Sequence, residues 1–254
     1  MNTCAVVDLG LLGYTEAYAL QQRVVALRKV EKIGDTLLCC EHPHTITLGR
    51  SGKTRNLLAG ENVLRQKGVE FHHSDRGGDI TYHGPGQLVG YPIVNLAAIR
   101  RDVGWYVRML EEAMIRASAD FGVVAEREAG KTGIWVSGAA GTRPEKLAAI
   151  GVHLSRWVTS HGFAYNVSTD LRYFDLIVPC GIAERKATSL EKLLARGSPL
   201  REVAERVTQH LGTVLDLEMR ELPFEQFRQN LIAAEATIAV PAELATLAAG
   251  RSPA

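Results

Sequence analysis

The chain has 254 residues, which is enough to bury a sizeable core as one large domain or two small ones. Its 29 lysine and arginine residues nearly balance its 28 acidic residues, so the composition predicts no basic face of the kind that binds nucleic acid. No apolar run is long enough to span a bilayer, the N-terminus lacks the pattern of a secretory signal, and the cysteines lack Cys-x-x-Cys spacing. These features favour a protein of the reducing cytoplasm.

Apolar spacing predicts the first elements along the chain. They are an amphipathic helix over residues 16–31 that should cover a sheet, short strands over 37–40 and 45–48, and a short helix near 61–66. Cys39 and Cys40 fall in the first strand, where buried, inert thiols are expected. His42 and His44 could offer two metal ligands between the strands, but no third ligand is in view, so no metal site is predicted.

The segment 76–93 contains five glycines and two prolines and therefore adopts special backbone shapes. Residues 79–83 and 87–93 read as short strands with Gly-Pro-Gly between them, which predicts a hairpin. Gly77 and Gly78 permit a positive φ or a close approach to bare backbone, and Arg76 could meet an anion or a carbonyl there. The segment is either a ligand-facing wall or a hairpin that only turns the chain.

The rest of the chain alternates strands and helices. We expect a helix over 102–121 capped by Asp102 and strands over 123–125, 132–136, 147–154 and 163–167. A mobile loop is expected over 137–144, and residues 159–162 are expected to separate the last two strands. Further helices are expected to start near 188, 198 and 223. Several strand connections are too short for crossover helices, so the predicted fold class is α/β (α+β), a mixed sheet with packed helices. The predicted organisation is one domain over 1–235 and an alanine-rich tail over 236–254.

Cys180 is the candidate nucleophile. It follows an apolar run and precedes a glycine, a setting that suits either a reactive thiol or a buried small hydrophobic residue. A thiol with a pKa near ~8.5 needs a nearby cation or base to become a thiolate. His83, His153 and His161 are possible bases, and Lys146 taken alone reads as a surface lysine.

A set of motifs follows one another in a fixed order. They are Glu41-His42-Pro43 with Thr47 to Arg50, Arg76 to Leu88, Ala149 to Val152, His161 to Ala164, and Asp170 to Ile182 ending in Pro179-Cys180-Gly181-Ile182. Over residues of about 10 to 230 the chain thereby resembles the octanoyl-[acyl carrier protein]:protein octanoyltransferases of lipoate assembly. The resemblance implies the catalytic-domain fold of biotin and lipoate protein ligases.

The resemblance also implies site residues. Cys180 would accept the acyl group, and Lys146, which precedes the Ala-Ile-Gly motif, would be its proton acceptor. The acyl-binding residues would be Arg76, Gly77, Gly78, Asp79, Ile80, Thr81, Tyr82, His83, Ala149, Ile150, Gly151, Gly162, Phe163 and Ala164. Thr188 and backbone N–H groups near Gly181 are further candidates, for binding the oxyanion.

The implied activity is transfer of an octanoyl group from octanoyl-acyl carrier protein to a lysine of a lipoyl domain through a cysteine thioester. Acceptors would be the lipoyl domains of 2-oxoacid dehydrogenase complexes and the glycine cleavage H protein. No cofactor, metal or ATP is expected, and a monomer is the default. Two alternatives stay open: an ATP-dependent lipoate or biotin protein ligase of the same fold, and a non-catalytic acyl- or carrier-binding module.

Overall fold

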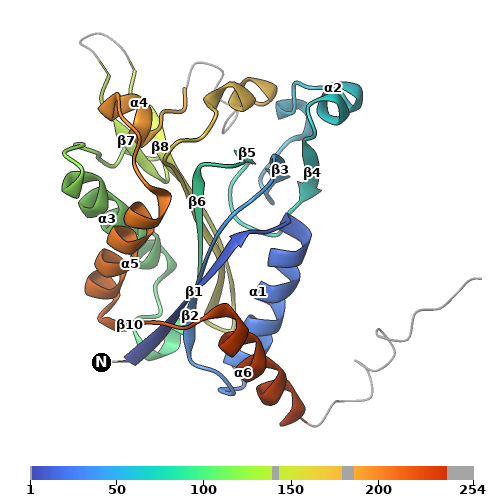
Figure 1. Cartoon of the computed structure of the whole chain (residues 1–254), viewed down its shortest axis with the longest axis vertical. Coiled ribbons are helices and arrows are strands. Elements are labelled where there is room, and N and C mark those ends of the chain that lie inside the picture. Colours follow the sequence, from blue (N-terminus) through green and yellow to red (C-terminus); the bar gives the residue numbers. More distant parts are fainter. Residues whose placement is uncertain (1, 139–142, 179–185, 239–254) are drawn as a thin grey trace, which may run out of the picture.

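A computed structural model describes residues 2–138, 143–178 and 186–238, whose strands form two sheets (Figure 1). The strands of the larger sheet are β1 (Asn2–Leu11), β2 (Asp35–Glu41), β6 (Gln87–Ile93), β7 (Ile134–Val136), β8 (Glu145–Ser155), β9 (Val158–Asn166) and β10 (Leu217–Glu221). Their order is β10-β1-β2-β6-β9-β8-β7. β1 is parallel to β2 and β10, and the other pairs are antiparallel, so the predicted mixed sheet is confirmed.

The smaller sheet has the order β4-β3-β5, from β3 (Thr45–Leu48), β4 (Glu70–His73) and β5 (Ile80–His83). Its apolar side packs with the helix α2 (Glu61–Gln66) and the 3₁₀ helix η3 (Leu171–Leu176). Ile46, Ile80 and Tyr82 are almost fully buried in this cluster. The small sheet therefore has a core of its own beside the large one.

The predicted hairpin over 79–93 is wrong, although both of its strands exist. β5 pairs with β3 in the small sheet, and β6 pairs with β2 and β9 in the large one. Gly84 and Gly86 turn the chain from one sheet to the other instead of folding it back, since β5 buries Ile80 and Tyr82 in the small core. The segment thus connects the two sheets.

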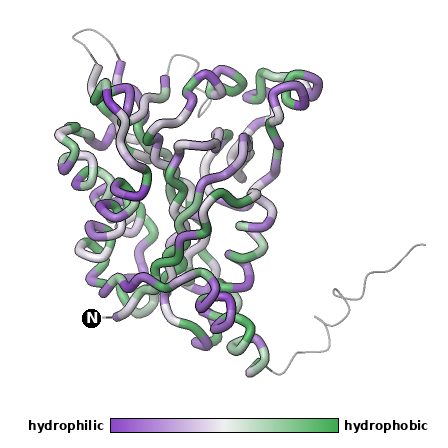
Figure 2. The backbone as a smooth tube through the Cα atoms, viewed as in Figure 1, coloured by the Kyte–Doolittle hydropathy of each residue, from purple (hydrophilic) through white to green (hydrophobic). Residues whose placement is uncertain are grey.

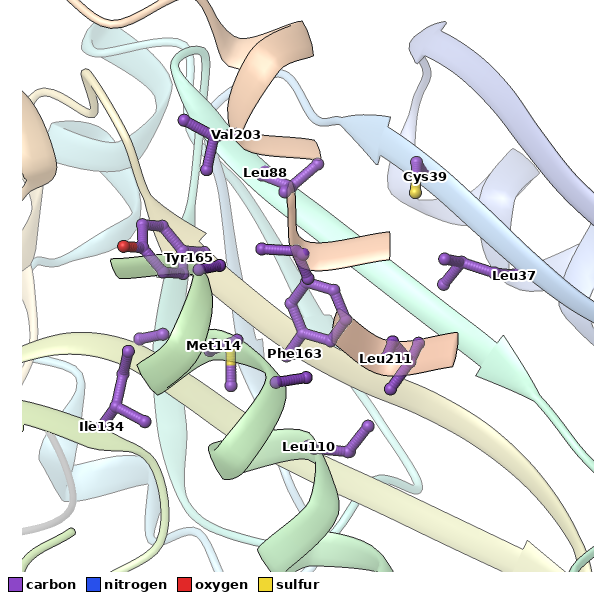
Figure 3. Packing of buried hydrophobic residues seen from close by; sticks show 14 of the residues in the cluster. Leu37, Cys39, Leu88, Leu110, Met114, Ile134, Phe163, Tyr165, Val203 and Leu211 are labelled. Atoms are coloured by element: carbon purple, nitrogen blue, oxygen red, sulfur yellow. The ribbon is translucent and has the colours of Figure 1, made fainter. Parts of the chain in front are cut away.

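Helices cover both faces of the large sheet. α3 (Val103–Asp120) and α5 (Leu200–Leu215) pack on one face, and α1 (Tyr14–Lys29) and α6 (Phe224–Ala236) on the other, while α4 (Leu190–Leu194) lies near β7 and the start of β8 (Figure 1). Leu110, Met114 and Leu211 meet Phe163 and Tyr165 of β9 in the larger core (Figure 3). Hydropathy follows this arrangement, with apolar strands in the centre and polar residues on outer helix turns (Figure 2). Cys39 and Cys40 are buried, as predicted.

Other boundaries also differ from the sequence-based expectation. β1 and β10 were not predicted, and residues 123–125 form no strand. Residues 159–162 lie inside β9, and the turn between β8 and β9 is instead at Arg156 and Trp157, whose φ angles are 52° and 65°. Asp102 caps α3 as predicted by accepting a hydrogen bond from the Trp105 N–H. In the described residues, no helix is both long and apolar enough to cross a membrane.

Candidate active site

A cavity of about 730 Å³ lies where the segment 76–83 approaches β6, β8 and β9. Its wall brings together Lys146 and nearly all of the predicted acyl-binding residues. These are Arg76, Gly77, Gly78, Asp79, Ile80, Thr81, His83, Ala149, Ile150, Gly151, Gly162, Phe163 and Ala164. Segments separated by more than sixty residues in the sequence therefore form one continuous surface.

Arg76 fixes the backbone of the glycine-rich wall. Its Nη2 donates to the Thr47 carbonyl and to the Asp79 carbonyl, each at 2.7 Å, and its Nη1 donates to the Gly77 carbonyl at 3.1 Å. The Arg76 side chain is buried, so these charge-assisted bonds satisfy the guanidinium in place of water. The carbonyl partner expected for Arg76 is therefore present.

The glycines allow this wall to touch β8 directly. The Gly77 N–H donates to the Val152 carbonyl at 2.9 Å, and a Cβ atom on Gly151 would lie 2.7 Å from the Gly77 carbonyl oxygen. Gly78 has a φ of 89°, which side chains rarely adopt. The close approach to bare backbone predicted for this segment is therefore present in the structure.

Tyr82 is the one predicted acyl-binding residue outside the cavity wall. Its side chain belongs to the small core, where its hydroxyl lies 2.7 Å from Nδ1 of His44 and its ring stacks on Tyr173. Thr81 and His83 point away from the face of β5 that buries Tyr82, and Ile80, on the same face as Tyr82, packs in the small core and also borders the cavity.

Lys146 stands near the start of β8. Its N–H donates to the Lys186 carbonyl, and its carbonyl accepts from the Thr188 N–H, both at 2.9 Å. Its Nζ lies 4.5 Å from the centroid of the Trp135 ring. Cys180, the predicted nucleophile, and Gly181 lie outside the described residues, as does the central part of the predicted loop 137–144.

Thr188 lies beside Lys146 and is completely buried. Its carbonyl accepts a hydrogen bond from Nδ2 of Asn166, a residue of the cavity wall, at 3.0 Å. Its hydroxyl has no hydrogen-bond partner within the described part of the chain. Thr188 is not among the residues of the cavity wall, so its oxyanion role stays a prediction.

Two of the three alternative bases line the cavity. His83 donates from Nδ1 to Oε1 of Gln87 at 2.8 Å, and burial lowers its pKa to about 3. His161 lies 2.7 Å from the Asp75 carboxylate, but burial still lowers the pKa of His161. His153 is outside the wall, 3.8 Å from Asp75. His83 and His161 are thus mainly neutral at pH 7, and Nε2 of His83 also has a protein partner, the Thr47 hydroxyl at 3.2 Å.

Sequence reasoning missed several residues of the wall. They include Tyr14, Gln87, Tyr91, Lys131, Trp135, Asn166 and Phe174. Gln87 orders the centre of the site, because its amide donates to Asn166 at 2.9 Å while its oxygen holds His83. A polar side chain at the start of an apolar strand was the available signal for Gln87.

The two histidines considered as metal ligands have other partners. Nδ1 of His42 lies 2.6 Å from the Leu12 carbonyl, and Nε2 lies 2.6 Å from the Tyr91 hydroxyl. Nδ1 of His44 bonds with Tyr82. No group of three or more metal-ligating side chains occurs among the residues that the structure describes.

Comparison with known proteins gives consistent matches. Residues 13–212 match the family model of the lipoyl protein ligase A/B catalytic domain. An octanoyltransferase of Solibacter usitatus is 53% identical over 219 residues, which are 86% of this chain and 96% of the relative. An octanoyltransferase of Chloroflexus aurantiacus is 50% identical over 221 residues, covering 87% and 97% of the two chains.

Solved structures resemble the fold at low sequence identity. A bipartite lipoate protein ligase of Thermoplasma acidophilum superposes with a TM-score of 0.70 at 15% identity, covering 93% of each chain. A lipoate-protein ligase A bound with ATP gives a TM-score of 0.68 at 13% identity, covering 93% of this chain and 95% of the other. These likenesses confirm the predicted fold of the catalytic domain.

Proposed function

The chain belongs to the octanoyltransferases of the lipoyl protein ligase A/B catalytic domain family, and we propose that it carries an octanoyl group from acyl carrier protein to a lysine of lipoyl domains. It is an acyltransferase of protein lipoylation. The acyl carrier protein donor, the acceptor lysine and a thioester on Cys180 are the proposed details.

The observation that carries the proposal is the single cavity shared by Lys146 and the acyl-binding segments. Apolar parts of its wall, such as Ile80, Ile150 and Phe163, suit an alkyl chain. Each buried methylene contributes ~0.8 kcal/mol, so an eight-carbon chain gains most of its binding free energy from such a wall.

In the proposed first half-reaction, the Cys180 thiol attacks the carbonyl carbon of the octanoyl thioester while Lys146 accepts the thiol proton. The C–S bond to the carrier breaks, the leaving carrier thiolate takes up the proton from Lys146, and octanoyl-Cys180 remains. The Thr188 hydroxyl, buried beside Lys146, is the proposed donor to the transient oxyanion.

In the second half-reaction the amine of the acceptor lysine attacks the octanoyl-Cys180 carbonyl. An amide forms, the C–S bond breaks, and the amine proton passes through Lys146 to the released thiolate. The incoming acyl group is already activated as a thioester, so the sequence of steps balances without ATP.

The test is intact-protein mass spectrometry after incubation with octanoyl-acyl carrier protein in the absence of ATP. We expect a gain of one octanoyl group that hydroxylamine removes and that an apo lipoyl domain discharges. The gain should be absent in Cys180→Ser and present in Cys4→Ala, which alters a buried thiol in the large core. Transfer that requires ATP and free octanoate would instead identify a ligase, and a stable adduct that is never discharged would identify a binding module.

A further inference from the structure

His161 has an unusual backbone for a residue in the middle of a strand. Its φ is 55°, in the left-handed region, although it lies inside β9. A non-glycine residue in that region costs of the order of 1 kcal/mol or more and persists only where its surroundings hold it. His161 is also only 2% exposed and lines the cavity, so the constrained backbone aims an imidazole ring at the site.

Three contacts hold the His161 ring and backbone in place. Nε2 donates to the Asp75 carboxylate at 2.7 Å, and the His161 N–H donates to Oε1 of Gln21 at 2.9 Å. The ring stacks on Tyr18, with centroids 5.6 Å apart, and the Tyr18 hydroxyl donates to the same Asp75 oxygen at 3.1 Å. An entering group would have to break a charge-assisted hydrogen bond to move this ring.

His161 lies at the far end of the cavity from Lys146. On β8 the cavity wall runs from Lys146 to Val152, and on β9 it runs from Asn166 to His161. Val152 and His161 face each other in the strand register. Because Val152 is six residues beyond Lys146 along a strand, the two ends of the wall are ~20 Å apart. Tyr91, which meets the His161 ring edge-on, ends the wall on β6.

We propose that His161, held by Asp75, closes the acyl-binding part of the cavity and sets the upper limit of acyl chain length. The inference rests on the proposed acyl transfer and names a determinant of its specificity. An acyl chain anchored near Lys146 runs along Ala149, Gly151 and Gly162 toward this ring. Carbons beyond the limit would press against a polar, hydrogen-bonded group and gain no burial.

The test compares acyl transfer from hexanoyl, octanoyl, decanoyl, dodecanoyl and tetradecanoyl thioesters. His161→Gly removes the ring and suits the left-handed backbone, so the variant should fold. We expect the ratio of tetradecanoyl to dodecanoyl kcat/KM to rise about tenfold in His161→Gly, as two newly buried methylenes would produce, because only the longer chains of the series approach the far end of a wall of ~20 Å. His161→Asn, which also tolerates the left-handed backbone and is smaller than histidine, should give a smaller rise and provides the test if the glycine variant does not fold.

His153→Ala is the matched control, because His153 also neighbours Asp75 but lies outside the cavity wall. Its chain-length profile should equal that of the wild type. A His161→Gly or His161→Asn variant that transfers octanoyl groups but keeps the wild-type ratio of tetradecanoyl to dodecanoyl transfer would overturn the inference. A wild type that transfers no acyl group at all would remove the proposed function, and this inference with it.

Discussion

Lys146 and Trp135 are direct neighbours in the β7–β8 register, and the Lys146 Nζ lies 4.5 Å from the centroid of the indole ring. The Nζ of Lys131 approaches the same ring at 5.6 Å. A cation over an indole face is attracted by ~0.5–2 kcal/mol, depending on its exposure to water. Trp135 therefore restricts the position of the Lys146 amine, the proposed proton acceptor.

The first prediction concerns this ring. Trp135→Leu should lower kcat for octanoyl transfer about tenfold with a smaller effect on KM, because the Lys146 amine loses a fixed position while the acyl wall remains. Trp135→Phe, which keeps an aromatic face, should recover part of the rate. Trp105→Leu removes a comparable cation–π contact, with Arg100, outside the cavity and serves as the control. Equal rates in Trp135→Leu and wild type would show that the contact is incidental.

A second prediction concerns the approach of the glycine-rich wall to β8. Gly151→Ala places a methyl group 2.7 Å from the Gly77 carbonyl oxygen, so the wall must move and the hydrogen bond from Gly77 to Val152 should weaken. Overpacking of this kind costs about 1–3 kcal/mol. We expect a lower melting temperature and at least a tenfold loss of kcat/KM for octanoyl transfer.

Gly197→Ala is the control for that substitution. No atom lies within 4 Å of the added methyl group, and Gly197 is not among the glycines with positive φ. Activity and melting temperature should therefore stay at their wild-type values. A Gly151→Ala enzyme that matches Gly197→Ala in both measurements would mean that the wall tolerates displacement.

The third prediction concerns Arg76. Arg76→Lys keeps the charge but replaces a planar fork of donors with one ammonium group, which cannot reach Thr47, Gly77 and Asp79 together. Buried carbonyls left without donors cost about 1–3 kcal/mol each. Thermal unfolding should show a fall of about 2–4 °C for each kcal/mol lost. Arg65→Lys on the exposed side of α2 should leave the transition unchanged, and an equally stable Arg76→Lys would argue that water replaces the lost donors.

The sequence predicted local backbone geometry better than it predicted which strands pair. Gly77 and Gly78 signalled a close approach, and the structure places both in one wall against Gly151, which the sequence indicated only through the family resemblance. The pairing partners of β5 and β6 were not readable, because they depend on distant surfaces. Gly90, for example, lacks a side chain where the Phe163 ring of β9 packs, and a turn motif carries no information on that contact.

The site residues missed by sequence reasoning also depend on tertiary context. Residues 159–162, Thr-Ser-His-Gly, have turn-forming composition, yet the turn is at Arg156 and Trp157, two residue types that rarely take a positive φ. The shift moves His161 from a predicted loop into a strand of the cavity wall. Trp135 read only as part of an apolar strand, since nothing in its own segment indicates that Lys146 lies opposite.

The fourth prediction concerns stability at acid pH. Burial, followed by the nearby His42 and Arg76, lowers the pKa of His83 to about 3, whereas an unfolded histidine titrates near 6.5. Below about pH 6.5 the unfolded chain therefore binds a proton that the folded chain does not, so the stabilisation is complete above that pH and is lost as the pH falls toward 3.

His83→Gln cannot take up this proton, so its free energy of unfolding should fall less steeply than that of the wild type between about pH 6 and pH 4, by up to ~1.4 kcal/mol per pH unit. Urea unfolding at several pH values measures this slope, with His73→Gln at an exposed position as the control. A wild-type slope in His83→Gln would mean that His83 is protonated in the folded protein and that its hydrogen bond to Gln87 rearranges on acidification.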